Sequence, residues 1–89
     1  MSDSKYYIPN RLRKYRRDMG YSQQYVAKKL KLPSSCNLSR WEKGLTRPSI
    51  EDLLKLSLLY NTLVEQLYAD LKETLREELQ LNSLQQHGK

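Results

Sequence analysis

The 89-residue chain is long enough for one small domain, and its 17 leucines supply the apolar side chains of a single core. Sixteen Lys and Arg residues against ten Asp and Glu residues give a net charge of +6, which indicates an anionic partner. One Cys and one His exclude an internal disulfide and argue against a zinc site, and no apolar run approaches the roughly 20 residues of a membrane span.

The basic side chains are concentrated in the first half of the chain. Residues 1–47 hold 12 basic and three acidic residues, whereas residues 48–89 hold four basic and seven acidic ones. A segregated positive half is typical of a protein that binds a polyanion. A lysine-rich, solvated helical surface would have the same composition, so charge alone does not decide between these two interpretations.

Helical spacing of apolar residues, in a chain poor in Val, Ile, Gly and Pro, predicts an all-α fold. Five helices are expected, over about 8–19, 23–30, 35–42, 50–60 and 63–85. Gly20 is a helix stop, and Ser22 is a good N-cap for the second helix. Either Ser34 or Ser35 caps the third helix, in which Trp41 is expected in the core rather than stacked on a base.

The last two predicted helices begin with capping sequences and are rich in leucine. Ser49 to Asp52 imitates a capping box, and Thr62 to Glu65 matches one. Leucines then recur every four residues along the fifth helix, which no Gly or Pro interrupts. One small core cannot cover so long a row, so we expect Leu71, Leu75 and Leu79 to project beyond the domain.

Several short motifs occur in the order and at nearly the spacing of one known family. They are LRKYRRDMGYSQ (12–23), VAKKL (26–30), LSRWEKG (38–44), TRPS (46–49) and LLKL (53–56). Together they resemble the phage-repressor/Cro/Xre helix-turn-helix family over about residues 8–68. The resemblance implies a five-helix, lambda-repressor-like DNA-binding domain over residues 1–68, here followed by an extension of the last helix over residues 69–89.

Two features depart from the family pattern. The turn between the second and third helices usually contains a Gly, where this chain has Lys31, Leu32 and Pro33, and the turn is one residue longer. The leucine-rich C-terminal extension is absent from the minimal family domain. The longer turn leaves open which serine caps the third helix and which side chains lead into a DNA groove.

The resemblance places three groove-facing, base-reading residues on the third helix. Counted back from Trp41, they are Ser35, Cys36 and Arg40. Arg can bind both acceptors of guanine, and Ser and Cys can make short polar or thymine-methyl contacts. The alternatives are a solvated surface arginine, a purely capping serine and a packing cysteine.

Further positions that match the family are expected to contact the DNA backbone or to hold the helices together. The backbone set is Gln23, Asn37, Lys43, Thr46 and Arg47. Arg16 and Glu42 fall where relatives form a structural ion pair. No Gly-rich phosphate loop, metal-ligand spacing or nucleophile triad occurs, so we expect no enzymatic activity, no cofactor and no metal.

These observations predict a cytoplasmic, sequence-specific DNA-binding transcriptional regulator that acts as a repressor and reads the major groove with helix 35–42. Two half-sites are usually needed for affinity, so we expect a homodimer on double-stranded DNA, paired through Leu71, Leu75 and Leu79. The alternative is a protein-interaction or antitoxin-like module whose leucine-rich helix binds another protein. A membrane role is not expected, because the basic first helix lacks bulky apolar anchors.

Overall fold

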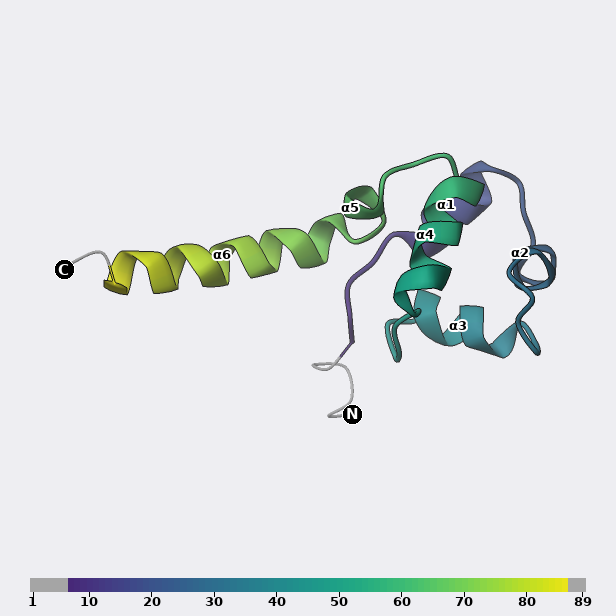
Figure 1. Ribbon diagram of the computed structural model, residues 1–89, viewed down its shortest axis with the longest axis horizontal. Coiled ribbons are helices and arrows are strands. Elements are labelled where there is room, and N and C mark those ends of the chain that lie inside the picture. The colour runs from purple at the N-terminus through teal and green to yellow at the C-terminus, as the bar shows by residue number, and fades with distance from the viewer. Residues whose placement is uncertain (1–6, 87–89) are drawn as a thin grey trace.

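The structure, a computed structural model, describes residues 7–86, with side chains described up to residue 80. Within this part of the chain there are six helices and no strand: α1 (Leu12–Asp18), α2 (Gln23–Lys29), α3 (Cys36–Glu42), α4 (Ile50–Leu59), α5 (Val64–Leu67) and α6 (Ala69–Gln86). The predicted all-α fold is confirmed. The first four helices gather at one end of the molecule, and α6 extends away from them (Figure 1).

The core is a cluster of hydrophobic side chains contributed by the first five helices and the residues that end them. Its buried members are Leu12, Val26, Ala27, Leu30, Leu38, Trp41, Leu56, Tyr60 and Leu67. Full burial of one such leucine stabilises the fold by about 1.5–3 kcal/mol. Trp41 is 5% exposed, so its predicted place in the core is confirmed. The side chains described in α6 contribute no buried member to this core.

Two of the predicted serine caps are present. The Ser22 hydroxyl accepts a hydrogen bond from the Tyr25 N–H at 3.0 Å, which starts α2. The Ser49 hydroxyl accepts one from the Asp52 N–H at 3.1 Å, which starts α4. Each bond satisfies a backbone donor that the first turn of a helix leaves without an internal partner.

Four helices end in the same left-handed turn. The residues in this conformation are Gly20 (φ 78°), Lys31 (φ 61°), Gly44 (φ 79°) and Asn61 (φ 54°). In each case the next residue donates its N–H to the carbonyl five residues earlier, the bond that defines a Schellman motif. Lys31 therefore adopts the conformation that a Gly supplies in the family turn, and Leu32 folds back against the core.

Replacing Lys31 with Gly should raise the free energy of unfolding by about 0.5–1 kcal/mol. A left-handed non-Gly residue costs about 1–2 kcal/mol, part of which the greater freedom of Gly in the unfolded chain offsets. Urea denaturation measures the difference. The matched control is Lys28→Gly in the last turn of α2, where the residue is helical, and it should lower stability by about 1 kcal/mol. A loss of stability in Lys31→Gly would contradict the assignment.

The start of α1 differs from the prediction. The helix begins at Leu12 rather than near residue 8, and Met19 at its other end is 39% exposed. The reason is Asn10, whose side-chain oxygen accepts from the Leu12 N–H at 3.0 Å and whose amide donates to the Trp41 carbonyl at 3.1 Å. Asn10 thus starts α1 and joins it to the end of α3, and Ile8 lies outside the helix.

The single helix predicted over 63–85 is divided at Tyr68, where φ is −122° and ψ is 40°. The Leu67 carbonyl accepts from the Arg11 N–H at 2.8 Å, so it is bonded outside its own helix. The capping role predicted for Thr62 was also wrong: Leu63 is the N-cap of α5, and the Thr62 hydroxyl contacts the Gln66 side chain instead. The break at Tyr68 separates α5, which completes the core, from α6, which leaves it.

A surface ion pair fixes the base of α6 to α1. The Arg11 guanidinium donates to both carboxylate oxygens of Asp70, at 3.2 and 3.0 Å. These hydrogen bonds lower the pKa of the Asp70 carboxyl. Any stability from this contact is therefore present above the ordinary pKa of aspartate and is lost as the pH falls through the lowered value.

Tyr60 is 2% exposed, and its hydroxyl has no hydrogen-bond partner among the described residues. Burial raises the pKa of this hydroxyl well above its ordinary value. Tyr60→Phe should therefore leave the free energy of unfolding unchanged or raise it by about 1 kcal/mol, because it removes a buried polar atom that bonds nothing. Tyr60→Ala, which opens a cavity, should lower it by about 3–5 kcal/mol. If chemical denaturation showed a loss above about 1 kcal/mol in Tyr60→Phe, the Tyr60 hydroxyl would have a hydrogen-bond partner after all.

Candidate nucleic-acid interface

Helix α3 has one buried face and one face turned to solvent. Leu38 and Trp41, three residues apart, are buried and attach the helix to the core. Cys36 and Arg40, four residues apart, fall on the other side of the helix and are exposed. A short helix held on one side by its apolar residues and open on the other has the dimensions that the major groove of DNA admits.

The start of α3 shows which of the two serines forms the side-chain capping hydrogen bond. The Ser34 hydroxyl accepts from the Cys36 N–H at 3.2 Å, whereas Ser35 forms no side-chain cap. Ser35 is half-buried at the N-cap position. Because Ser34 supplies the capping bond, the hydroxyl of Ser35 is not needed for it.

A largely buried ion pair joins α1 to the end of α3. Arg16 Nε donates to Glu42 Oε2 at 2.6 Å and an Arg16 terminal nitrogen donates to Glu42 Oε1 at 3.2 Å, with side-chain exposures of 11% and 4%. The other Arg16 terminal nitrogen donates to the Tyr21 carbonyl at 2.8 Å. The hydrogen bond to Glu42 raises the pKa of the Arg16 guanidinium above its ordinary value. The structure thus brings these two residues together as a brace behind α3.

Gln23, the first residue of α2, lies against the same brace. Its amide nitrogen donates to Glu42 Oε1 at 2.9 Å. Glu42 therefore accepts hydrogen bonds from both α1 and α2, which fixes the start of α2 relative to α3. This contact could not be found from the sequence, because no spacing rule links residues 23 and 42.

A polar hollow of about 550 Å³ lies between α1, α2 and α3. Among the candidate residues it brings together Gln23, Ser35 and Lys43. It also contains side chains that sequence reasoning did not single out, namely Arg13, Gln24 and Ser39. The sequence could have indicated Ser39 through its spacing, because it lies one helical turn after Ser35 and one turn before Lys43 and so shares their side of the helix.

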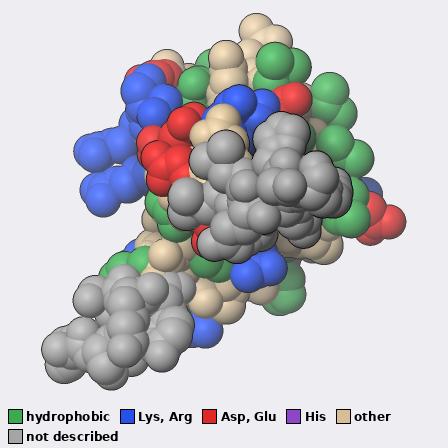
Figure 2. Space-filling view, turned by 90° about the vertical axis from the view of Figure 1, so that its left-hand side faces the viewer, with side chains coloured by type: hydrophobic (Ala, Val, Ile, Leu, Met, Phe, Trp, Pro, Cys, Tyr) green, Lys and Arg blue, Asp and Glu red, His purple; other side chains and the backbone are tan. Residues whose placement is uncertain are grey.

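The remaining candidates lie around this hollow or away from it. Asn37 is exposed on α3, Arg47 is exposed in the loop that follows, and Thr46 beside it is half-buried. Leu71, Leu75 and Leu79 lie on α6 and are not part of the hollow. Seen from the end of α6, basic side chains project from one edge of the molecule and hydrophobic ones follow the opposite edge (Figure 2).

Within residues 7–86 no group of His, Cys, Asp and Glu side chains is arranged to hold a metal ion. Over the same residues no helix combines the length and the apolar character that a bilayer crossing requires.

Comparison with known proteins identifies the family. A family model described as helix-turn-helix matches residues 12–67. The chain is also similar to the HTH-type transcriptional regulator ImmR of Bacillus subtilis (strain 168), with 41% identity over 54 residues. That match covers 61% of this chain and 42% of ImmR, so the chain corresponds to less than half the length of this relative. No solved structure matches the chain significantly. The chain belongs to the Xre/Cro-like helix-turn-helix family of DNA-binding proteins.

Proposed function

We propose that this protein is a sequence-specific regulator, acting as a repressor in the cytoplasm, that inserts α3 into the major groove of its operator. The observation that carries the proposal is the orientation of α3. Leu38 and Trp41 anchor one side of the helix, and the brace of Arg16 and Glu42 holds its end, so the opposite side is presented rigidly to solvent. The assignment as a repressor follows the resemblance to phage repressors.

Three side chains would read bases: Ser35 and Cys36 at the start of α3, and Arg40 one turn further along the helix. Arg40 is exposed and would donate two hydrogen bonds to the O6 and N7 acceptors of a guanine. Cys36 is exposed one turn earlier and offers a small side chain to a thymine methyl group. Ser35 has a hydroxyl that the cap does not require and borders the polar hollow, so it can contact a base edge.

The residues around α3 would bind the phosphate backbone and set its register. Gln23 and Lys43 line the polar hollow, and Asn37, Thr46 and Arg47 lie on α3 and the loop after it. Gln23 is held by Glu42, so its amide is positioned before DNA arrives. Such contacts add affinity without sequence preference and make binding sensitive to salt.

We further propose that residues 1–68 form the DNA-binding domain and residues 69–89 the dimerisation segment. Leu75 is 46% exposed and Leu79 is 67% exposed, and Leu71 at the base of the row is half-buried. A second copy would cover this apolar row and place two α3 helices about 34 Å apart on successive major grooves.

Selection of bound duplexes from a random library tests the proposed function. We expect a recurring half-site, present twice in the enriched duplexes with a spacing of about one helical turn. Binding to the enriched duplex should exceed binding to a scrambled one across a salt series. Equal affinities for both duplexes, each falling steeply with salt, would reduce the protein to a non-specific DNA binder.

Arg40→Lys should lower the ratio of specific to non-specific affinity by about tenfold, because lysine lacks the paired donors that match guanine. Non-specific affinity should change little, since the charge is kept. Competition between enriched and scrambled duplexes at one salt concentration gives the ratio. The control is Arg47→Lys at a backbone contact, where the ratio should be unchanged. An Arg40→Lys protein with full specificity would remove Arg40 from the base-reading set.

A second candidate function is an antitoxin-like module that binds another protein through α6. The exposed leucine row favours it, because a hetero-partner would cover this row as well as a second copy would. Sedimentation of the purified protein distinguishes the two functions. Self-association favours the homodimeric regulator, whereas a monomer with the row exposed favours the module.

A further inference from the structure

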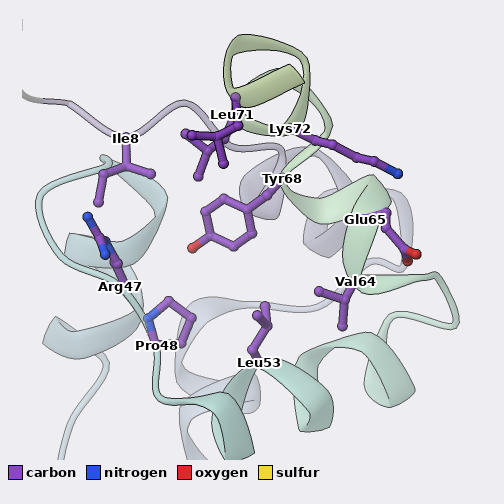
Figure 3. A pocket seen from close by; sticks show the side chains of 10 residues that line it. Ile8, Arg47, Pro48, Leu53, Val64, Glu65, Tyr68, Leu71 and Lys72 are labelled. Atoms are coloured by element: carbon purple, nitrogen blue, oxygen red, sulfur yellow. The ribbon is translucent and has the colours of Figure 1, made fainter. Parts of the chain in front are cut away.

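An apolar groove of about 340 Å³ lies where α6 leaves the domain (Figure 3). Leu53 of α4, Val64 of α5 and Tyr68 between α5 and α6 line it, together with Leu71 and Leu75 of α6. Figure 3 shows Tyr68 in the middle of these side chains. The Tyr68 hydroxyl is buried without a hydrogen-bond partner among the described residues, and burial raises its pKa to about 12.

The groove continues onto the exposed surface of α6. A second hollow shares Lys72 and Leu75 with the groove and extends to Leu79. Apolar side chains therefore follow one another from the domain wall at Leu53 through Leu75 to Leu79, which is 67% exposed, and Lys72, Arg76 and Gln80 line the second hollow beside them. A helix laid along this surface would contact both α6 and the domain.

Charged side chains lie on both sides of the groove. Arg47 lies on the side of Ile8, and Glu65 and Lys72 lie on the other side (Figure 3). The leucine row of α6 is also flanked by opposite charges, because at 100° per residue Glu78 and Arg76 fall on opposite sides of Leu75 and Leu79.

We infer that a second copy of this chain lays the outer part of its α6 antiparallel to the first, so that Leu79 of each copy enters the groove of the other. This inference rests on the proposed homodimer and names the surface through which the two copies bind. In this arrangement Glu78 of the second copy lies on the side of Arg47, and its Arg76 lies on the side of Glu65. Arg47 and Glu65 are opposite in charge to these residues, Lys72 on the side of Glu65 has the same charge as Arg76, and a two-fold axis repeats the contacts.

Parallel pairing of the two α6 helices uses less of this surface. The leucine rows would meet, but both grooves would stay uncovered. A stable interface buries about 1,000 Å² or more, which three leucines from each copy do not supply alone. Antiparallel docking covers both rows and both grooves. Arg47 keeps its role in the proposed DNA contact, because a guanidinium has five donors and can bind a carboxylate and a phosphate together.

A charge-reversal cycle tests the arrangement in the absence of DNA. Glu65→Arg and Arg76→Glu should each raise the dimer dissociation constant, measured by sedimentation, by about two- to fivefold, and the double variant should restore it. Glu77→Arg, on the side of α6 opposite the leucine row, is the control and should leave the constant unchanged. Single variants that weaken the dimer with no rescue in the double variant would overturn the pairing of these two residues.

Disulfide trapping separates this inference from the proposed function. In a Cys36→Ser background, Leu53→Cys with Leu79→Cys should form a crosslink between copies, whereas Leu79→Cys alone should not, since the two Leu79 positions lie apart. Rapid crosslinking of Leu79→Cys alone would establish parallel pairing. This result would support the homodimer and exclude the antiparallel docking. A wild-type chain that sediments as a monomer at all concentrations would overturn both.

Discussion

Glu42→Ala should lower the free energy of unfolding by about 3–5 kcal/mol, the typical loss when one member of a buried ion pair is removed. Arg16, whose side chain is only 11% exposed, would keep its charge but lose both hydrogen bonds to the carboxylate. Gln23 would lose its partner as well. Urea denaturation measures the loss, and DNA binding should weaken in parallel because the end of α3 is no longer held.

The control for this prediction removes both charges together. Arg16→Met with Glu42→Leu leaves no buried charge without a partner, and such replacements are often neutral or stabilising. We therefore expect the double variant to regain most of the stability of the wild-type protein. Gln23 should still be incorrectly positioned, because its carboxylate partner is absent. A loss below about 1 kcal/mol in Glu42→Ala would show that the pair is solvated and does not brace α3.

Gly44→Ala should lower the free energy of unfolding by about 2–4 kcal/mol. A Cβ at this position would lie 2.6 Å from the Ile8 carbonyl oxygen and 2.8 Å from the Ile8 nitrogen, and both are backbone atoms that cannot turn aside. The left-handed conformation adds about 1–2 kcal/mol for any residue with a Cβ. The hydrogen bond from the Ile8 N–H to the Gly44 carbonyl, 2.9 Å long, would be strained with it.

Gly20→Ala is the matched control. Gly20 has almost the same φ, 78°, and ends a helix in the same way, but its Cβ would meet no atom within 4 Å. Its loss should therefore be limited to the conformational cost of about 1–2 kcal/mol. The difference between the two variants measures how tightly the segment at Ile8 is held against the end of α3. Equal losses would mean that Ile8 moves away without cost.

Local signals in the sequence predicted the features that depend on local chemistry. Ser22 and Ser49 cap helices because a serine before a helical segment can bond the first backbone donors. Trp41 is buried because it shares a helix face with Leu38. In each case the partner lies within four residues or on the same helix, so spacing alone was sufficient.

Features that depend on distant partners could not be predicted in this way. α1 starts late because Asn10 bonds the Trp41 carbonyl, and the last helix breaks at Tyr68 because Arg11 takes the Leu67 carbonyl. The same limit applies to the site. The contact of Gln23 with Glu42 and the presence of Ser39 in the polar hollow depend on how three helices pack. The candidate base-reading residues came from the family resemblance, which the match over residues 12–67 now supports.

In the proposed complex the outward face of α3 enters the DNA groove, and the single cysteine of the chain reports on this face directly. Cys36 is exposed at the start of α3, so a neutral alkylating reagent should modify it readily in the absence of DNA. With enriched duplex at about 100 times its dissociation constant, only about 1% of the protein is unbound, and the alkylation rate should fall by up to about a hundredfold. In Leu58→Cys, which keeps Cys36, the added thiol on the exposed side of α4 should keep its alkylation rate when DNA binds. An unchanged rate at Cys36 under saturating DNA would show that the outward face of α3 does not enter the groove.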